Sequence, residues 1–279
     1  MTLAELKNYF ETELTGFYPS EEVQSFFNIL TQAWLGYSRM DISLNASEVI
    51  PSEINIKFKN TIERLKRSEP IQYIVGSTEF YGLPFVVNQD TLIPRPETEE
   101  LVEWILEDKR NKVKILDIGT GSGCIAIALA GMNPEAEVTA LDISEKALDI
   151  ARKNADLNEV EVSFLQTDIL TVTTLPDHYD IIVSNPPYVR EQEKKLMHDN
   201  VLLYEPDSAL YVSEDDPLKF YRAICKLASH HLKPEGVLFF EINEYLSKEM
   251  VSLLDEEGFH NIDVRRDFRG KDRFVNCTL

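Results

Sequence analysis

The sequence of 279 residues has no apolar run that approaches the roughly 20 residues needed to span a bilayer. Its first residues, MTLAELKNYFETEL, lack the basic stretch followed by an apolar stretch that is typical of a signal peptide. Only three cysteines occur (Cys124, Cys225 and Cys277), and none belongs to a C-x-x-C pair. A disulfide framework or a zinc site is therefore not expected. These absences predict a cytoplasmic protein without a membrane segment or a metal.

Positive charge is also scarce, because 28 lysine and arginine residues face 48 aspartate and glutamate residues. The net charge of −20 disfavours a protein that wraps DNA or RNA, since such proteins need a cationic surface to bind phosphates. A basic protein partner suits this charge better. We therefore expect no direct nucleic-acid partner, no membrane partner and a monomeric state.

Residues 1–70 have helical periodicity. LAELKNYFETEL is amphipathic at helical spacing. A second helix is predicted to begin with Ser20 as its N-cap and to end near Gly36. A third is predicted to open at residues 51–53 and to be closed by Pro70. Helices with short loops predict a small helical bundle as the N-terminal domain.

The pattern changes after residue 70. IQYIVGSTEFYGLPFVVNQ contains β-branched and aromatic runs broken by glycines and a proline, which predicts a β-hairpin linker over residues 71–90. Strands and helices alternate from about Val113, and this alternation predicts a Rossmann-like, doubly wound and mostly parallel sheet within residues 91–279. The tail, IDVRRDFRGKDRFVNCTL, predicts a closing hairpin that makes the last strand antiparallel.

A glycine loop follows the first strand of this α/β region. LDIGTGSG places Gly119, Gly121 and Gly123 between the strand and its helix, where glycine permits a positive φ and lets a ligand approach the backbone. Ligands of this fold bind at that edge of the sheet. Asp142 ends the next strand, and its carboxylate can accept hydrogen bonds from both hydroxyls of a ribose. The loop therefore predicts a nucleoside cofactor.

The spacing of the glycines separates two cofactors. Dinucleotide sites usually read G-x-G-x-x-G, with the helix start facing a pyrophosphate. Here the pattern is D-x-G-x-G-x-G, and the acid Asp117 would repel a pyrophosphate but suit an ammonium and a sulfonium. The sequence therefore favours S-adenosylmethionine over NAD. Asp168, after the third strand, either accepts from the amino group of adenine or only caps a turn, and Ile169 can pack on the adenine ring.

The stretch VSNPPYV ends the fourth strand of the region with Asn185, Pro186, Pro187 and Tyr188 at the same edge as the glycine loop. The Asn185 side-chain oxygen and the Pro186 carbonyl, held rigid by the prolines, can accept both hydrogens of a planar NH2 group. This arrangement points the nitrogen lone pair at a methyl donor, and the Tyr188 ring can stack on the flat group. The segment predicts methyl transfer to an amide or an aromatic amine.

With these motifs in view, the chain resembles the HemK/PrmC family, S-adenosylmethionine-dependent methyltransferases of the glutamine in peptide chain release factors. The resemblance is carried by PIQYIVGSTEFYG, TLIPRPETEELV, ILDIGTGSGCIAIALA, VSNPPYV and YEPDSAL. It implies a class I S-adenosylmethionine-dependent methyltransferase fold over residues 91–279. It also implies that the substrate is the glutamine of the Gly-Gly-Gln motif in class I release factors, methylated at its amide nitrogen, N5. We expect residues 1–70 to bind the release factor.

The resemblance also implies roles for individual residues. The cofactor is expected to contact Gly119, Thr120, Gly121, Ser122, Gly123, Asp142 and Asn185, and residues 185–188 are expected to hold the glutamine side chain. Residues 95–99 are expected to lie close to the active cleft. Asn243 stands where family members often have glycine, and we expect it to alter a local turn without touching the motif residues. Ile169 stands where some relatives have an aromatic residue, so that adenine packing can differ.

Three other functions fit the sequence less well. Methylation of the N6 amine of adenine in DNA or RNA uses nearly the same chemistry, but the net charge disfavours it. A non-catalytic binding module is disfavoured by the complete cofactor loop and target motif. An NAD oxidoreductase is disfavoured by the glycine spacing and by five dispersed histidines.

Overall fold

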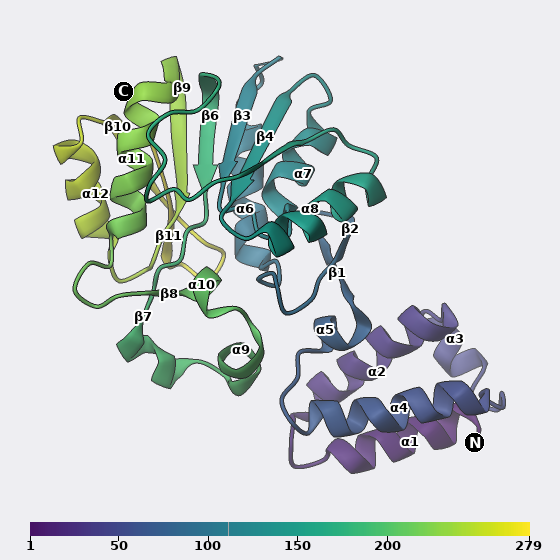
Figure 1. The fold of residues 1–279 in the computed structure, drawn as a ribbon. Helices are drawn as coiled ribbons and strands as arrows, with labels where there is room; N and C mark the ends of the chain where they lie inside the picture. Colours follow the sequence, from purple (N-terminus) through teal and green to yellow (C-terminus); the bar gives the residue numbers. More distant parts are fainter. Residues whose placement is uncertain (111) are drawn as a thin grey trace. The chain divides into compact units, whose positions relative to one another are not determined.

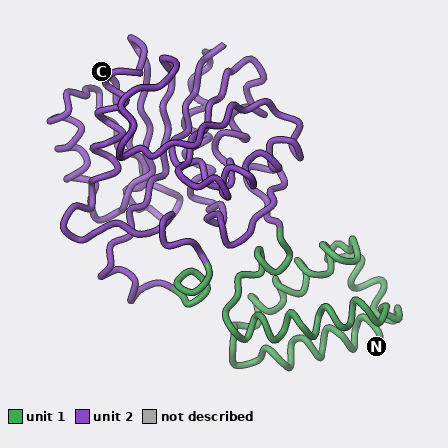
Figure 2. The backbone as a smooth tube through the Cα atoms, in the orientation of Figure 1, with its two compact units in different colours: residues 1–76, 198–204 green, residues 77–197, 205–279 purple. Residues whose placement is uncertain are grey.

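The structure is a computed structural model that describes residues 1–110 and 112–279. It divides into two compact units, shown in Figure 2. Unit 1 contains residues 1–76 and 198–204, and unit 2 contains residues 77–197 and 205–279. Within the described residues, no helix combines the length and the apolar character that a membrane crossing requires.

Unit 1 is built from helices (Figure 1). They are α1 (Leu3–Leu14), α2 (Ser20–Leu35), α3 (Arg39–Leu44), α4 (Ser52–Leu65), α5 (Ile71–Val75) and α9 (Asp199–Tyr204). The rings of Phe10, Phe27 and Phe58 contact one another in its core, with centroids between 5.4 and 5.9 Å apart. The Tyr204 hydroxyl donates to the Arg67 carbonyl at 2.9 Å, so α9 is attached to the N-terminal helices although it lies far along the chain.

Two helix boundaries predicted for unit 1 are wrong. Pro19 rather than Ser20 is the N-cap of α2, and no side chain caps that end. Helix α4 ends at Leu65, and Pro70 instead precedes α5, so that Ile71–Val75 is helical where an extended chain was predicted. Proline is suited to a helix start because the N–H group it lacks would have no partner within the helix.

Unit 2 contains a seven-stranded sheet of order β10-β11-β9-β6-β3-β4-β5. Its strands are β3 (Lys114–Ile118), β4 (Glu137–Asp142), β5 (Ser163–Gln166), β6 (Tyr179–Ser184), β9 (Leu232–Glu241), β10 (His260–Arg266) and β11 (Asp272–Thr278). Strand β11 is antiparallel to both of its neighbours, and the other pairs are parallel. The predicted doubly wound sheet with an antiparallel last strand is confirmed.

Helices cover both faces of this sheet (Figure 1). They are α6 (Pro96–Leu106), α7 (Cys124–Met132), α8 (Glu145–Leu157), α11 (Lys219–His231) and α12 (Ser247–Glu256). Ile115 packs in the buried cluster of α6 and α7, whereas the next residue, Leu116, packs in the cluster of α11 and α12. The central strand β3 therefore buries both of its faces, as is typical of a parallel sheet. Helix α12 was not predicted, although Met250 and Leu254 anchor it in the second cluster.

Short elements complete unit 2. They are the antiparallel hairpin β1 (Ser77–Phe80) and β2 (Leu83–Val86), the parallel pair β7 (Val189–Arg190) and β8 (Tyr211–Val212), the 3₁₀ helix Glu191–Leu196, and α10 (Asp207–Leu210). Because β6, β3 and β4 are adjacent and parallel, the residues that follow them meet at one edge of the sheet.

Candidate active site

A cavity of about 370 Å³ lies at this edge, within unit 2. The two predicted motifs both contribute to its wall. The predicted site residues that line it are Gly119, Thr120, Gly121, Ser122, Asp142, Asp168, Ile169, Asn185, Pro186 and Pro187. Asp117, Gly123 and Tyr188 do not line it. The structure therefore brings the glycine loop (residues 119–123) and most of the Asn-Pro-Pro-Tyr segment (residues 185–188) to one cavity.

The glycine loop is open towards a ligand. Gly119 and Gly121 have φ values of +74° and +55°, and no heavy atom lies within 4 Å of where a Cβ would stand. The amides of Gly119 and Thr120 donate to the Leu141 carbonyl at 2.8 and 3.0 Å, which ties the loop to the end of β4. Space and positive φ together make a cradle that residues with side chains would strain.

Gly123 differs from Gly119 and Gly121 in having no room for a side chain. A Cβ at Gly123 would stand 2.8 Å from Ile127 Cδ1 and 3.1 Å from Ala151 Cβ. Its missing side chain therefore allows α7 and α8 to pack closely. The cofactor contact expected of Gly123 stays a prediction.

Asp117 lies fully buried beneath the loop. Its Oδ2 accepts a hydrogen bond from the Thr120 hydroxyl at 2.6 Å, whereas its Oδ1 has no hydrogen-bond partner among the described residues. Burial raises the pKa of Asp117 to about 7. A buried oxygen without a partner is costly, although the Ala126 backbone amide lies close enough to lower the pKa of this carboxyl.

Asp142 ends β4 at the cavity wall. Its Oδ2 accepts from the Gly121 amide and its Oδ1 from the Ser144 amide, both at 2.9 Å. Burial raises its pKa. Each carboxylate oxygen has capacity for a further hydrogen bond, so two neighbouring hydroxyls can bind without displacing the backbone donors.

Asp168 caps a turn and also lies at the cavity. Its Oδ1 accepts from the Leu170 amide at 2.8 Å and so caps a turn, and the residue also lines the cavity beside Ile169. The adenine contact of these two residues stays a prediction.

The Asn185 side chain is held by α6. Its Nδ2 donates to Thr98 Oγ1 at 3.4 Å, and the Thr98 hydroxyl in turn donates to Glu241 Oε2 at 2.7 Å. Thr98 and Glu241 are each 2% exposed. None of the described residues donates a hydrogen bond to Asn185 Oδ1. The amide oxygen of Asn185 is thus available as an acceptor.

Tyr188 reaches the same carboxylate. Its hydroxyl donates to Glu241 Oε1 at 2.9 Å, and its ring packs against the core cluster of α11 and α12. Burial, reinforced by the Glu241 charge, raises the pKa of Tyr188 far above its ordinary value, so the phenol stays a neutral donor. The stacking role expected of its ring stays a prediction.

Asn243 does contact a motif residue, so the expectation that it would affect only a local turn is wrong. Its Nδ2 donates to the Tyr188 carbonyl at 3.0 Å and to Glu193 Oε2 at 2.9 Å. The reason is the strand order, because β9 pairs with β6 and the residues after the two strands lie side by side. Nothing in the sequence indicated that β9 and β6 are neighbours.

Four further residues that support the site were not predicted as site residues. Thr98 and Glu241 hold Asn185, as described above. The Glu205 side chain, 1% exposed, pairs with Arg95 Nη2 at 2.6 Å and accepts from the Ile93 amide, which joins the IPRPE and YEPDSAL stretches. Arg95 lines the cavity, and the expected closeness of residues 95–99 to the cleft is confirmed for Arg95 and Thr98.

The fourth residue, Asn154 on α8, is buried among apolar residues. Its Oδ1 accepts from the Val86 amide at 2.7 Å, and its Nδ2 donates to the Ser122 carbonyl at 2.9 Å. Asn154 therefore ties the glycine loop to β2. A single amide on the apolar face of a helix was the available signal, because a buried polar group must find partners.

Comparisons with known proteins agree with this geometry. Residues 5–76 match the model of the PrmC N-terminal domain, and residues 96–212 match the model of the methyltransferase small domain. A crystal structure of a methyltransferase from Pyrococcus furiosus is similar with a TM-score of 0.54 at 19% identity, covering 78% of this chain and 98% of that chain. A 16S rRNA methyltransferase from T. thermophilus, in complex with AdoMet and guanosine, is similar with a TM-score of 0.50 at 21% identity, covering 72% and 49%. These two structures support the class I methyltransferase fold alone.

Closer relatives are found by sequence. The chain is 48% identical to the release factor glutamine methyltransferase of Flavobacterium psychrophilum, covering 98% of this chain and 99% of the relative. It is 43% identical to the release factor glutamine methyltransferase of Bacteroides thetaiotaomicron, covering 97% and 98%. The chain belongs to the HemK/PrmC family of release factor glutamine methyltransferases.

Proposed function

We propose that this protein transfers a methyl group from S-adenosylmethionine to the amide nitrogen, N5, of the glutamine in the Gly-Gly-Gln motif of class I peptide chain release factors. The observation that carries this proposal is the shared cavity, which is lined by the open glycine loop and by Asn185 with its amide oxygen available. The family of the chain supports the choice of substrate.

The residues of the cavity fit S-adenosylmethionine. Asp142 would accept from the ribose hydroxyls, and Asp117, buried behind the cavity wall, would favour the ammonium group through its negative charge. Asp168 and Ile169 would contact adenine. The glycine loop would surround the part of the cofactor between its ammonium group and its ribose. When bound, the cofactor supplies a methyl group that is electrophilic because it is attached to a sulfonium.

The protein's own groups prepare the amide. A carboxamide nitrogen attacks weakly because its lone pair is delocalised into the carbonyl. Asn185 Oδ1 and the Pro186 carbonyl would accept its two hydrogens and turn the lone pair towards the glycine loop. Pro186 and Pro187 stiffen the backbone that carries the Pro186 carbonyl, because each ring fixes its own φ. Most of the rate would come from this positioning, which can be worth roughly 7–11 kcal/mol. The methylated nitrogen would then lose its proton to water.

Methylation of the adenine amine in DNA or RNA is not favoured. It would use the same acceptors, because adenine also presents a planar NH2 group. The net charge of −20 opposes binding to a polynucleotide, and the similar full-length relatives are named for release factors.

A division of labour between parts of the chain follows from this function. We propose that residues 1–70 bind the release factor and that residues 91–279 carry out the methyl transfer. Residues 71–90 would link these two parts of the chain. The match of residues 5–76 to the PrmC N-terminal domain supports it. A short Gly-Gly-Gln peptide should then have a kcat/KM at least about tenfold below that of the intact factor, since remote contacts lower the barrier. Equal values for the peptide and the factor would argue against the role of residues 1–70.

We further propose that the protein acts as a monomer in the cytoplasm, where the free thiols of Cys124, Cys225 and Cys277 stay reduced.

Mass spectrometry tests the proposed reaction. The protein is incubated with S-adenosylmethionine and a class I release factor, and the factor is digested and sequenced by fragmentation. A mass gain equal to one methyl group in place of one hydrogen is expected on the glutamine of Gly-Gly-Gln. A factor with alanine at that glutamine is the control and should gain nothing. Modification of added DNA or RNA with an unmodified factor would overturn the proposal.

A further inference from the structure

We propose that Glu241 and Thr98 are positioning residues that set the direction of the Asn185 carboxamide, so that its oxygen and not its nitrogen faces the amide of the substrate. The identity of the substrate amide rests on the proposed function. The orientation of Asn185 is a separate claim that can be tested without turnover.

The first step is to establish which group receives the hydrogen of the Thr98 hydroxyl. A carboxylate can only accept hydrogen bonds, and Glu241 Oε2 lies 2.7 Å from Thr98 Oγ1. The single hydrogen of Thr98 is therefore committed to Glu241. Towards Asn185, the Thr98 oxygen can act only as an acceptor.

The second step is the consequence for Asn185. Its Nδ2 lies 3.4 Å from Thr98 Oγ1 and donates to it. A carboxamide turned by half a rotation would place its oxygen against the Thr98 oxygen, and two acceptors without a hydrogen between them repel. The chain Glu241–Thr98–Asn185 therefore selects one of two orientations that have nearly the same shape. Only that orientation offers an acceptor to an incoming NH2 group.

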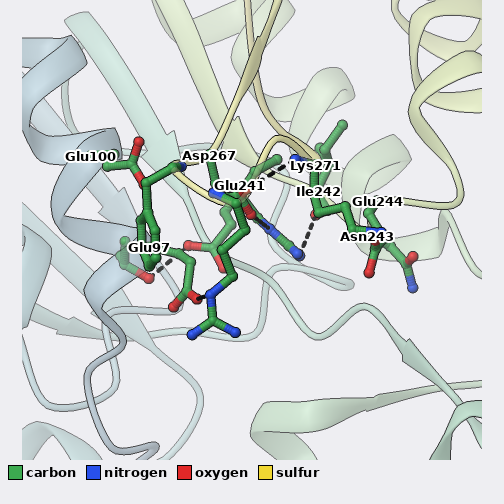
Figure 3. A network of polar contacts seen from close by, with 12 residues as sticks. Glu97, Glu100, Glu241, Ile242, Asn243, Glu244, Asp267 and Lys271 are labelled. Carbon is green, nitrogen blue, oxygen red and sulfur yellow. Dashed lines mark hydrogen bonds and ion pairs between the residues drawn. The ribbon is translucent and has the colours of Figure 1, made fainter. Parts of the chain in front are cut away.

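The third step is the way in which Glu241 itself is held. Its other oxygen accepts from the Tyr188 hydroxyl at 2.9 Å, so one carboxylate fixes both ends of the Asn-Pro-Pro-Tyr segment. The Tyr221 hydroxyl donates to the backbone carbonyl of Glu241 at 3.0 Å. Figure 3 shows Glu241 close to Glu97 on one side and to the Asp267–Lys271 turn on the other. Hydrogen bonds from Thr98, Tyr188 and Tyr221 therefore hold Glu241 in place.

The surroundings of Glu241 act on its pKa in both directions, and the net effect is a rise. Burial raises its pKa, as the Glu97 charge also does, while the hydrogen bonds from Thr98 and Tyr188 and the positive charge of Arg273 lower it. Arg273 is held in turn by Asp267 Oδ2 at 3.1 Å and donates to the Ile242 carbonyl. Replacing such a buried polar network by apolar residues often leaves stability unchanged or improved, so its presence beside Asn185 points to function.

Isosteric variants test the inference. Thr98→Val keeps the shape of the side chain and removes the hydroxyl, and it should lower kcat by about 10- to 50-fold with cofactor affinity within about twofold of wild type. Thr98→Ser keeps the hydroxyl and should retain at least about a third of kcat. Glu241→Gln should resemble Thr98→Val, because its amide can present a donor to Thr98. Thr139→Val, at a partly buried threonine of β4 that does not line the cavity, is the matched control and should leave kcat unchanged.

A double-mutant cycle separates positioning from general damage. In an Asn185→Ala background, Thr98→Val should cause no further loss of kcat, because the group that it orients is gone. A loss in that background as large as in the wild type would overturn the inference.

A readout without turnover keeps the two proposals distinguishable. In protein labelled with ¹⁵N on asparagine, the Asn185 side-chain NH2 should exchange slowly with solvent in the wild type and in Thr98→Ser, and faster in Thr98→Val. Suppose that the wild type methylates glutamine and that Thr98→Val is fully active with unchanged exchange of the Asn185 NH2 group. This inference would then be wrong, while the proposed function would stand. A wild type that does not methylate the factor would overturn the proposed function, and the exchange rates would still decide how Asn185 is oriented.

Discussion

The two ends of the cavity are held in different ways. At the glycine loop, the hydrogen bonds span at most 32 residues: Thr120 to Asp117, three residues apart, Gly121 to Asp142, 21 apart, and Asn154 to Ser122, 32 apart. At the Asn-Pro-Pro-Tyr segment, Asn185 reaches Thr98 across 87 residues and Tyr188 reaches Glu241 across 53. The cofactor end of the cavity, at the glycine loop, is thus built mainly from nearby parts of the chain. The amide end, at residues 185–188, is assembled from three distant parts.

This difference predicts two separable kinds of defect. Changes at the glycine loop should alter how tightly the cofactor binds or how stable the loop is. Changes around Asn185 should alter turnover while the cofactor still binds. A glycine-loop variant that lowers turnover with unchanged cofactor affinity would contradict this division. So would a variant around Asn185 that only weakens cofactor binding.

The largest effect is expected for Asn185→Ala. Loss of one preorganised hydrogen-bond acceptor should lower kcat by about 10²- to 10³-fold, or about 2.7–4 kcal/mol, by analogy with the loss of a single oxyanion donor. Cofactor binding, measured by calorimetry, should persist in a folded protein. Turnover close to that of the wild type would refute the role of Asn185 as an acceptor.

Asp117→Asn should stabilise the cofactor-free protein in a pH-dependent way. The folded pKa of Asp117, about 7, lies above the ordinary value of 3.8, so the folded state binds more protons than the unfolded state between these values. Its contribution to stability is therefore favourable at low pH and is lost as the pH rises towards 7. The variant should gain stability relative to wild type with rising pH, reaching roughly 4 kcal/mol at pH 8.

Urea unfolding of both proteins at several pH values between 4 and 8 measures this difference. Asp156→Asn, at an exposed position of α8, is the control and should give a constant difference. Parallel stability curves for Asp117→Asn and wild type would contradict the prediction.

Asp142→Ala should weaken cofactor binding by about 10- to 30-fold, or about 1.4–2 kcal/mol, because a hydrogen bond to a charged group is typically worth that much. At saturating cofactor, kcat should recover to near the wild-type value, in contrast to Asn185→Ala. Calorimetry and saturation kinetics give the two quantities. Asp149→Ala, exposed on α8, should change neither, and an unchanged dissociation constant in Asp142→Ala would count against ribose recognition.

The smallest effect is expected for Asn243→Gly, which introduces the residue that family members often have. It removes the hydrogen bonds to the Tyr188 carbonyl and to Glu193 Oε2 but leaves the hydrogen bond from Tyr188 to Glu241 in place. Of the lost bonds, only the neutral one to the Tyr188 carbonyl touches the Asn-Pro-Pro-Tyr segment, and its loss, about 0.5–1 kcal/mol, should lower kcat by roughly two- to fivefold. A loss as large as that of Thr98→Val would mean that the backbone of the segment, and not Glu241, sets its geometry.

Much of the fold was predictable because it follows from local patterns. The alternation after Val113 indicated the parallel sheet, and the glycine loop indicated where its ligand edge lies. Helix α12 was missed, and α5 was mistaken for extended chain because its five residues, IQYIV, are β-branched or aromatic in part. Helix α9 belongs with the N-terminal helices, which no local pattern could indicate.

The sequence by itself determined the strand and helix alternation, the cofactor loop and the identity of the amide-binding segment, because each depends on residues that are neighbours in the chain. Only the tertiary structure decided that Thr98, Glu241 and Asn243 surround that segment. The physical reason is the pairing of β9 with β6 and the packing of α6 beside them, which place polar groups in contact across long stretches of chain.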